Sequence, residues 1–398
     1  MPRSNNSWER RHRARSCRWR RSTMATPSKK IRILVVEDSP FMCKVLENIY
    51  NGDQQMQVVG SAKDGRQAIS LAESLKPDVI SMDINMPHMD GLQATAEIMT
   101  RNPRPIVIVS SESREGAAST LRALELGAIE FVAKPSSGVD LDMQTVKEDL
   151  LRKVRMAAKV RVVRTASGLA STIQAKGSIK PAAPAPPVSP RPAAGTGLDQ
   201  RFPVVVLAAS TGGPATVMRI APGFTRDFPA AVILVQHMPA TFTTQYAAQL
   251  AEFTEIRVKE AEANESLQPG TLYICPGGQH LRVTPTGRIQ LDGTSGRING
   301  YLPNIDATME SVAAFAGALS IGAVLTGMGN DGTNGVKAIK SAGGFVLAQD
   351  EATCVIFGMP SEAIKAGAVD QVLGIDDIYP AIEKRVVGLC RPAPAGVR

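Results

Sequence analysis

From residue 31 onward, short runs of β-branched and other apolar residues alternate with longer stretches in which apolar residues recur every three or four positions. The short runs predict buried strands, and the longer stretches predict amphipathic helices. The predicted strands cover residues 31–36, 57–62, 78–82, 106–109 and 130–133, and the predicted helices cover 40–50, 65–75, 92–100, 115–126 and a segment from residue 141 onward. This alternation predicts a five-fold βα unit with a parallel sheet.

A second alternating block begins at residue 203. Its predicted strands cover residues 203–208, 231–236, 321–325 and 344–348, and its predicted helices cover 215–220, 241–252, 307–318, 334–341 and 375–387. Residues 260–300 are richer in Gly and Pro and contain short strand-like pieces at 272–275, 281–283 and 289–291. We therefore expect a doubly wound α/β domain that carries an antiparallel excursion.

The stretch between the two blocks has a different composition. Residues 181–195 contain six prolines among mostly small residues, which is too little apolar volume for a core and predicts an extended linker. The 398-residue chain is expected to divide into a disordered basic extension at 1–30 with a possible start at Met24, a first domain at 31–151, a helix end and linker at 152–200, and a second domain at 201–392.

The positive charge lies outside the predicted domains. The net charge is +8, but residues 1–30 carry ten Lys and Arg against one Glu, and residues 152–198 carry nine basic residues and no acidic ones. The rest of the chain therefore has a net charge of about −10, which argues against a globular domain that binds nucleic acid.

Cysteine spacing and hydropathy exclude further classes. The five cysteines form no Cys-x-x-Cys pair and no cluster with the four histidines, so neither a disulfide framework nor a zinc site is indicated. The longest nearly uninterrupted apolar stretch, residues 312–325, is shorter than the roughly 20 residues that span a bilayer. We expect a cytoplasmic protein without a membrane span.

Polar side chains follow four of the predicted strands of the first block. Glu37 and Asp38 follow the first strand, Asp83 follows the third, Ser110 follows the fourth and Lys134 follows the fifth. The carboxyl ends of parallel strands meet at one edge of a sheet, so the three carboxylates would repel one another unless a hard cation such as Mg²⁺ and the lysine compensate. Such a pocket suits phosphoryl transfer, with Asp83 as the acceptor and with Lys134 and Ser110 able to hold the phosphoryl oxygens.

Each of these residues also has a simpler interpretation. An acidic residue after a strand commonly caps a helix or a turn, and Lys134-Pro135 could simply end a strand. The joint placement on four strand ends favours the site. With Val-Val-Glu-Asp-Ser, Met-Asp-Ile-Asn-Met-Pro and Ala-Lys-Pro in this order, residues 31–151 resemble a two-component receiver domain.

This resemblance implies roles for individual residues. Asp83 would be phosphorylated by a partner histidine kinase, with Mg²⁺ held by Asp38, Asp83 and the backbone carbonyl of Asn85. Phe131 falls where the family has its switch aromatic. Glu37 departs from the paired aspartates common in close relatives, and its longer side chain is expected to alter the metal geometry without abolishing binding.

The segment Ala-Ala-Ser-Thr-Gly-Gly-Pro at 208–214 lies where a predicted strand turns into a helix. Ser210 would be exposed at the strand end, near helix N-terminal amides that favour an anionic oxygen. Two alternatives stay open: Ser210 or Thr211 is only a helix cap, or the loop cradles a phosphate. The absence of Gly-x-Gly-x-x-Gly and Gly-Lys-Ser/Thr weakens the nucleotide version.

A nucleophilic serine needs a base and a group that orients it. His237, in Val-Gln-His-Met-Pro, ends the next predicted strand, so adjacent parallel strands would bring Ser210 and His237 to one edge. His280 lies in the irregular excursion and is expected to be a surface or substrate-facing residue. Asp331, in Leu-Thr-Gly-Met-Gly-Asn-Asp-Gly, could orient the base, although an Asx turn is a strong alternative for that residue alone.

The strings Ala-Ser-Thr-Gly-Gly, Val-Gln-His-Met-Pro, Pro-Gly-Gly-Gln-His and Thr-Gly-Met-Gly-Asn-Asp-Gly make about residues 201–390 resemble the catalytic domain of chemotaxis protein-glutamate methylesterases. The resemblance implies a Ser210, His237 and Asp331 triad and no cofactor for the ester chemistry. It makes the Met328 backbone amide a candidate oxyanion donor. The further oxyanion or substrate candidates are Thr211 and His280.

Together the two resemblances imply a phosphorylation-activated esterase that hydrolyses glutamyl methyl esters on chemoreceptors and also deamidates receptor glutamines. The expected partners are a histidine kinase and methyl-accepting receptors, with no nucleic acid and with membrane contact only through the receptors. The unphosphorylated receiver is expected to obstruct the catalytic cleft. The rival interpretations are a DNA-binding regulator, which lacks a recognisable helix-turn-helix block, and a catalytically silent docking protein.

Overall fold

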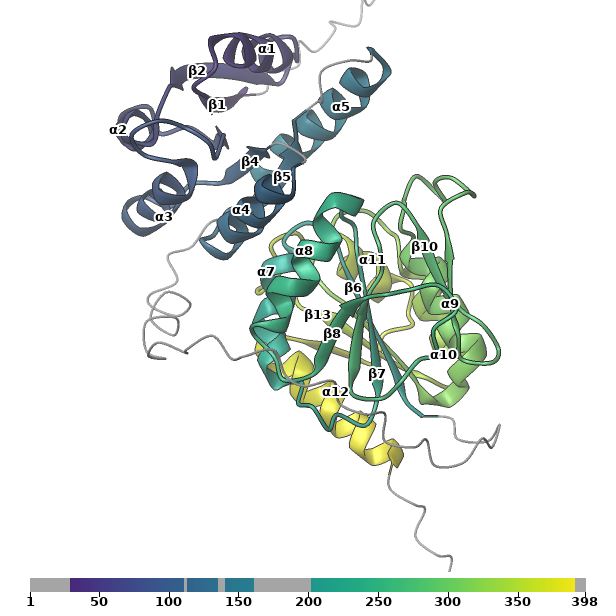
Figure 1. Ribbon diagram of the computed structural model, residues 1–398. Coiled ribbons are helices and arrows are strands. Elements are labelled where there is room, and N and C mark those ends of the chain that lie inside the picture. The colour runs from purple at the N-terminus through teal and green to yellow at the C-terminus, as the bar shows by residue number, and fades with distance from the viewer. Residues whose placement is uncertain (1–28, 111–112, 135–139, 161–201, 391–398) are drawn as a thin grey trace, which may run out of the picture.

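The computed structural model describes residues 29–110, 113–134, 140–160 and 202–390, which form two α/β units (Figure 1). Most of the expected basic extension at 1–30 and of the expected linker at 152–200 lies outside the described residues. Among the helices that the structure describes, none has the length and apolar character that crossing a bilayer requires.

The first unit contains a parallel sheet with the strand order β2-β1-β3-β4-β5. Its strands are β1 (Ile31–Val36), β2 (Met56–Ala62), β3 (Val79–Met82), β4 (Ile106–Ser110) and β5 (Glu130–Ala133). One face is covered by α1 (Pro40–Asn51) and α5 (Asp140–Ala157), and the other by α2 (Gly65–Leu75), α3 (Gly91–Arg101) and α4 (Arg114–Glu125). The predicted βα unit is confirmed.

Four helices of this unit begin at a side-chain cap. Ser39, Asp64, Asp90 and Ser113 each accept a hydrogen bond from the backbone N–H three residues further on, at the starts of α1, α2, α3 and α4. Such caps satisfy amides that the first turn of a helix leaves without partners. The cap of α1, Ser39, directly follows Glu37 and Asp38, so this helix begins next to two of the acidic residues.

The second unit contains a parallel sheet with the order β14-β13-β12-β6-β7-β9-β8. Its strands are β6 (Val204–Ala209), β7 (Ala231–Gln236), β8 (Arg257–Glu260), β9 (Thr271–Ile274), β12 (Ser320–Val324), β13 (Phe345–Gln349) and β14 (Gln371–Leu373). All residues of β6, β7 and β12 are buried, as expected for central strands covered on both faces.

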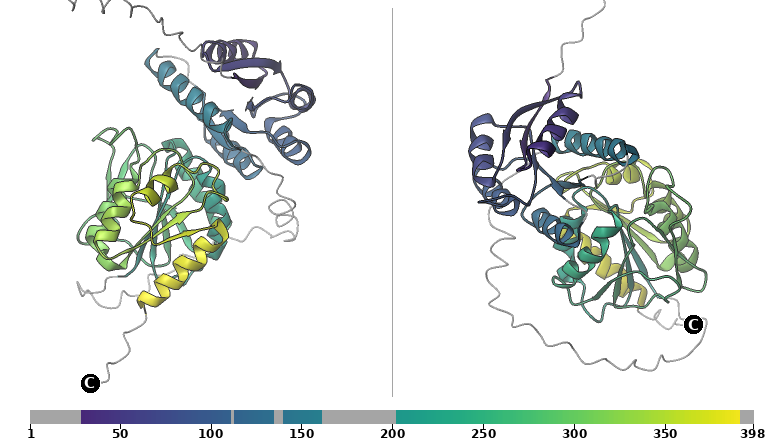
Figure 2. Two further views of the ribbon diagram at one scale, coloured as in Figure 1. Left: turned by 180° about the vertical axis from the view of Figure 1, so that it is seen from behind. Right: turned by 45° about the horizontal axis from the view of Figure 1, so that its top comes forward.

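Helices cover both faces of this sheet (Figure 2). On one face lie α7 (Gly213–Ile220), α8 (Ala240–Ala251) and α12 (Ile375–Cys390). On the other lie α9 (Ile305–Ala316), α10 (Thr333–Ser341), α11 (Met359–Lys365) and the antiparallel pair β10 (His280–Val283) and β11 (Ile289–Asp292). Two short 3₁₀ turns, Ala221–Gly223 and Gly317–Leu319, follow α7 and α9. The predicted doubly wound fold is confirmed.

The excursion differs from the expectation in one respect. The piece expected at 272–275 is not part of an antiparallel unit, because β9 pairs in parallel with β7 and β8 inside the main sheet. Local hydrophobic alternation indicates a strand but contains no information on its direction. The sequence pattern also missed β8, α11 and β14, which are short, and β8 and β14 are partly exposed.

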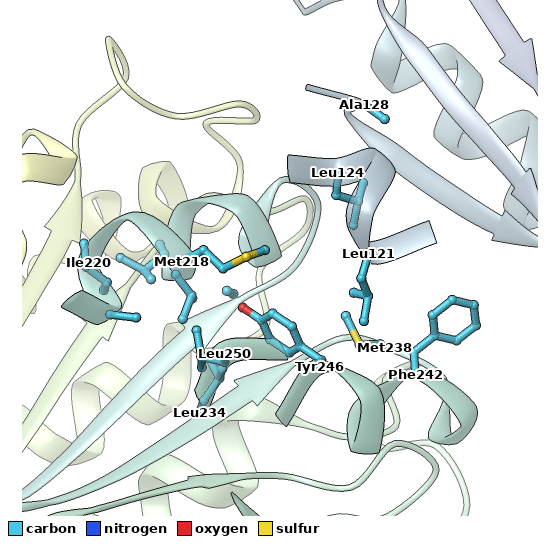
Figure 3. Packing of buried hydrophobic residues seen from close by; sticks show 14 of the residues in the cluster. Leu121, Leu124, Ala128, Met218, Ile220, Leu234, Met238, Phe242, Tyr246 and Leu250 are labelled. Atoms are coloured by element: carbon cyan, nitrogen blue, oxygen red, sulfur yellow. The ribbon is translucent and has the colours of Figure 1, made fainter. Parts of the chain in front are cut away.

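The two units meet along α4 of the first and α7 and α8 of the second. Figure 3 shows Leu121 of α4 directed towards Tyr246 and Phe242 of α8. The rings of Phe131 and Phe242 lie with their centroids 4.4 Å apart across this contact. Buried residues of both sheets therefore form one continuous apolar cluster.

Candidate active site

Ser210 and His237 leave the carboxyl edge of two neighbouring strands, β6 and β7. The register pairs Ala209 with Gln236, so Ser210 and His237 are the next residues on each strand. The His237 N–H donates to the Ala209 carbonyl at 3.1 Å, and the Ser210 N–H donates to the Thr326 carbonyl after β12 at 3.1 Å. The edge formed by β12, β6 and β7 therefore brings together the loops that contain the predicted nucleophile, base and carboxylate.

The Gln236 side chain joins the Ser210 and His237 loops. Its Nε2 donates to the Ser210 carbonyl at 2.8 Å and lies 3.3 Å from the His237 carbonyl. A Cβ at Gly213 would lie 2.1 Å from Gln236 Oε1, so the glycine is required for this close approach. Sequence reasoning missed Gln236, although it lies within one of the strings that gave the resemblance.

Asp331 accepts a hydrogen bond from His237 and is buried against the first residues of α9. Its Oδ2 accepts a hydrogen bond from His237 Nε2 at 2.8 Å, and its side chain is 0% exposed. Its oxygens also accept hydrogen bonds from Asn304 Nδ2 at 2.8 Å and from the backbone N–H groups of Ile305 at 2.8 Å, Asp306 at 3.1 Å and Gly332 at 3.1 Å. The carboxylate therefore does more than close a local turn.

This pairing decides which ring nitrogen of His237 is available for chemistry. A carboxylate can only accept, so Nε2 holds a proton and donates it to Asp331. The nitrogen left to accept a proton is Nδ1. The amides at the start of α9 stabilise the negative charge of Asp331, and this charge would in turn stabilise the imidazolium formed during proton transfer.

Two further residues missed by sequence reasoning contact the pair. Asn304 caps α9 with its side-chain oxygen and donates to Asp331 with its amide nitrogen. The Tyr301 ring stacks on the His237 imidazole, with centroids 4.8 Å apart and planes 16° from parallel. Both precede α9, more than 60 residues from His237 in the sequence, so local patterns hold no signal for these contacts.

Two of the oxyanion and substrate candidates, Met328 and Thr211, lie close to Ser210 in the chain or in space. Gly327 packs closely against Ser210, because a Cβ added at position 327 would lie 2.9 Å from Ser210 Cβ. The half-buried Met328 is the next residue in the chain. Thr211 is buried, and its carbonyl accepts from Thr326 Oγ1 at 3.0 Å. The roles of Met328 and Thr211 stay predictions.

The expectation of a surface or substrate-facing His280 is wrong. His280 lies in β10 and is 0% exposed. Its Nε2 lies 2.8 Å from the Gly296 carbonyl, a polar partner that offsets part of the cost of burial, whereas its Nδ1 is buried without a hydrogen-bond partner among the described residues. Its position in a Gly-rich stretch suggested exposure, because the sequence does not reveal this partner.

The acidic pocket of the first unit gathers three carboxylates and a lysine. Lys134 Nζ lies 2.9 Å from Glu37 Oε2 and 2.9 Å from Asp83 Oδ2. One oxygen each of Glu37, Asp38 and Asp83 lie within 4.8 Å of one another, with Asp38 exposed and the other two buried. Carboxylate oxygens at this spacing fit a hard divalent cation such as Mg²⁺.

Burial and charge act against each other in this pocket. Burial raises the pKa of the Glu37 carboxyl, and the hydrogen bond from Lys134 opposes that rise only in part. Burial lowers the pKa of Lys134, but the charges and hydrogen bonds of Asp83 and Glu37 outweigh it and leave this pKa above its ordinary value. Lys134 therefore remains a cation that compensates the carboxylates.

The remaining receiver candidates lie around this pocket. The Ser110 hydroxyl is buried and donates to the Gly116 carbonyl in α4 at 3.4 Å, and the structure records no hydrogen bond from it to Asp83. The Phe131 ring is 3% exposed and contacts Phe242 rather than solvent. Asn85 is exposed two residues after Asp83, and its ligand role stays a prediction.

Comparison with known proteins finds a matching family for each of the two units. The family model for CheB methylesterase matches residues 205–382, and the model for the response regulator receiver domain matches residues 33–145. A protein-glutamate methylesterase/protein-glutamine glutaminase of Pyrococcus horikoshii is 40% identical over 367 residues, which cover 91% of this chain and 95% of that protein. A protein of the same name from Symbiobacterium thermophilum is 41% identical over 367 residues, which cover 89% and 97%.

Two solved structures are also similar. The catalytic domain of Thermotoga maritima CheB methylesterase is 40% identical and covers 46% of this chain and 98% of its own, with a TM-score of 0.44. The response regulator domain of Thermotoga maritima CheB is 46% identical and covers 33% and 99%, with a TM-score of 0.31. With the identity and coverage of its relatives, the chain belongs to the CheB family of protein-glutamate methylesterases/protein-glutamine glutaminases, in which a receiver domain precedes a hydrolase domain.

Proposed function

We propose that this protein hydrolyses glutamyl methyl esters on chemoreceptors, releases methanol, and deamidates receptor glutamines at the same site. The proposal rests on the 2.8 Å hydrogen bond between His237 Nε2 and Asp331 Oδ2, next to the strand end from which Ser210 emerges. The family to which the chain belongs supports the substrate class.

The reaction would proceed through an acyl-enzyme. Ser210 Oγ attacks the ester carbonyl while His237 Nδ1 takes the hydroxyl proton, and the Asp331 charge stabilises the imidazolium. The tetrahedral intermediate collapses, and His237 returns the proton to the departing methoxide, which leaves as methanol. His237 then takes a proton from water, whose oxygen attacks the acyl group. The second intermediate collapses as His237 returns that proton to Ser210 Oγ, which frees a glutamate carboxyl and restores Ser210. A glutamine substrate would release ammonia in place of methanol.

Negative charge on the carbonyl oxygen needs donors that are already in place. The Met328 amide is our first candidate, because the preceding Gly327 packs against Ser210. Thr211 is the second, because it directly follows Ser210 at the turn into α7. Fixed amides in a partly buried site stabilise an oxyanion without reorganising.

The receiver would control access to this site. A histidine kinase would phosphorylate Asp83, and Mg²⁺ held by Glu37, Asp38, Asp83 and the Asn85 carbonyl would neutralise the phosphoryl oxygens. Lys134 already contacts Asp83, whereas the Ser110 hydroxyl would have to leave Gly116 to reach a phosphoryl group. We place the protein in the cytoplasm, at receptors and away from nucleic acid.

The contact between the units supports this regulation. Phe131 is three residues from Lys134, and its ring packs on Phe242 in the first turn of α8, the helix that begins three residues after His237. Gln249 of α8 donates a hydrogen bond to Glu125 at the end of α4. A phosphorylation-driven movement of Phe131 would therefore be felt next to the catalytic base.

The substrate proposal can be tested on methylated receptor membranes. The wild-type protein should convert methylated glutamates and specific glutamines of the receptors to glutamate, as mapped by peptide mass spectrometry. His237→Gln should leave both unchanged, because the general base is lost. Conversion at the wild-type rate by His237→Gln would refute the assignment.

A further inference from the structure

Two contacts constrain the His237 imidazole, and they constrain it differently. The hydrogen bond to Asp331 fixes the position of Nε2 but allows the ring to tilt about that point. The Tyr301 ring lies nearly parallel to the imidazole, at 16°, with centroids 4.8 Å apart, and so fixes the plane of the ring. Together they determine where Nδ1 points.

Tyr301 is held by a short hairpin. Ile298 and Tyr301 exchange both backbone hydrogen bonds, at 3.0 and 2.9 Å. The two residues between them, Asn299 and Gly300, both have positive φ, at 51° and 88°, which is typical of a type I′ turn. The turn delivers Tyr301 in a fixed orientation.

The segment that leads into the hairpin is anchored by Asp292 and His280. The Asp292 carboxylate accepts hydrogen bonds from the backbone N–H groups of Thr294 and Ser295 at 2.8 and 3.2 Å. The next residue, Gly296, bonds through its carbonyl to the buried His280 ring at 2.8 Å. His280 thus fixes the start of the segment that ends in Tyr301.

The phenol end of Tyr301 packs against Gly329. A Cβ at Gly329 would lie 2.0 Å from the Tyr301 hydroxyl oxygen, so the ring extends from His237 to the loop that holds Met328 and Asp331. A side chain at position 329 would push the ring away from the imidazole.

We propose that Tyr301 is a positioning residue for the catalytic base: its ring holds the plane of the His237 imidazole while Asp331 holds Nε2, so that Nδ1 is directed for proton transfer from Ser210. His280 anchors the hairpin that presents Tyr301. This inference rests on the proposed function, because it assigns His237 the role of base. A small misplacement of a catalytic group lowers the rate of the chemical step while substrate binding continues.

The kinetic test compares three variants of the full-length protein on methylated receptor membranes. Tyr301→Ala should lower kcat about 10- to 100-fold with KM within about twofold of wild type. Tyr301→Phe keeps the stacked ring and should stay within about threefold of wild type in kcat. Ile298→Ala, on the same hairpin but without the ring contact, is the matched control and should retain wild-type kcat.

A spectroscopic test does not depend on turnover. In protein with ¹⁵N-labelled histidine, the proton on His237 Nε2 should be observable by NMR and exchange slowly with water in the wild type, Tyr301→Phe and Ile298→Ala. In Tyr301→Ala it should exchange faster, because the ring can tilt away from Asp331. A merely structural role of Tyr301 would leave this resonance unchanged in a folded variant.

The outcomes separate this inference from the proposed function. Wild-type kcat and an unchanged resonance in Tyr301→Ala, or an equal loss in Ile298→Ala, would overturn the positioning role while leaving the triad intact. Failure of the wild type to release methanol would overturn the proposed function, and the resonance would still decide whether Tyr301 positions the imidazole.

Discussion

Asp331→Asn is expected to damage both stability and catalysis, and the structure allows the two effects to be estimated separately. The Asn amide can take two orientations in the carboxylate site. If its NH₂ replaces Oδ1, it faces three donors, from Asn304, Asp306 and Gly332. If it replaces Oδ2, it faces two, from Ile305 and His237.

The second orientation should prevail, because His237 can move its proton to Nδ1 and accept from the new NH₂. One buried N–H, that of Ile305, then loses its acceptor, at a cost of about 1–3 kcal/mol. Loss of the negative charge that Asp331 places against the start of α9 adds about 0.3–1 kcal/mol. For a domain of this size the sum lowers the unfolding midpoint by roughly 3–16 °C.

The same proton shift disables the base. With its proton on Nδ1, His237 cannot take one from Ser210, and the corresponding substitution in the serine protease triad lowers kcat about 10⁴-fold. Ser210→Ala should abolish turnover without changing the unfolding midpoint. Asp306→Asn, the same change of functional group in the first turn of α9, should keep its activity because Asp306 bonds the start of α10 and not His237.

Methanol release and calorimetric unfolding of the three variants, measured in parallel, test this reasoning. We expect Asp331→Asn to be impaired in both measurements, Ser210→Ala in activity alone, and Asp306→Asn to remain active. An Asp331→Asn variant that unfolds at the wild-type midpoint would refute the hydrogen-bond count, and one that retains wild-type kcat would refute the tautomer argument.

Three further predictions follow from the structure. Burial raises the pKa of the Asp306 carboxyl above its ordinary 3.8, so the native state binds more protons than the unfolded state. The stability of the wild type relative to Asp306→Asn should therefore fall as the pH rises from about 4 towards neutrality, as measured by the difference between their unfolding midpoints. Chelation of Mg²⁺, or Asp83→Ala, should abolish incorporation of labelled phosphate from a phosphodonor; labelling at the wild-type level in Asp83→Ala would place the phosphate elsewhere. Phe131→Ala removes a ring contact worth about 0.5–1.5 kcal/mol and should raise the unphosphorylated esterase rate roughly 2- to 10-fold, whereas an unchanged rate would show that the Phe131–Phe242 contact does not restrain the enzyme.

Much of the site follows from one rule, that parallel strands end at a common edge. Glu37, Asp83 and Lys134 could be placed together because each follows a predicted strand. In the structure the Lys134 ammonium lies 2.9 Å from a carboxylate oxygen of each of the other two. Ser210 and His237 could be placed on consecutive strands for the same reason, since consecutive strands in such folds are usually neighbours. These inferences needed only the order of the elements.

The contacts that complete the site could not be predicted in this way. β12 lies next to β6 although more than 100 residues separate them, so the approach of the Asp331 loop depends on a strand order that local patterns do not contain. Asn304 and Tyr301 reach Asp331 and His237 from the segment before α9, where no periodic pattern marks them. His280 shows the converse, because a polar residue in a Gly-rich stretch is buried once a carbonyl becomes its partner.

The most direct test of the account is methanol release from radiolabelled, methylated receptor membranes by the wild type and by Ser210→Ala, each with and without a small-molecule phosphodonor and Mg²⁺. We expect release by the wild type, faster release with the phosphodonor, and a loss of about 10⁶-fold in Ser210→Ala under both conditions. Release by Ser210→Ala at the wild-type rate would contradict the assignment of the nucleophile and with it the mechanism.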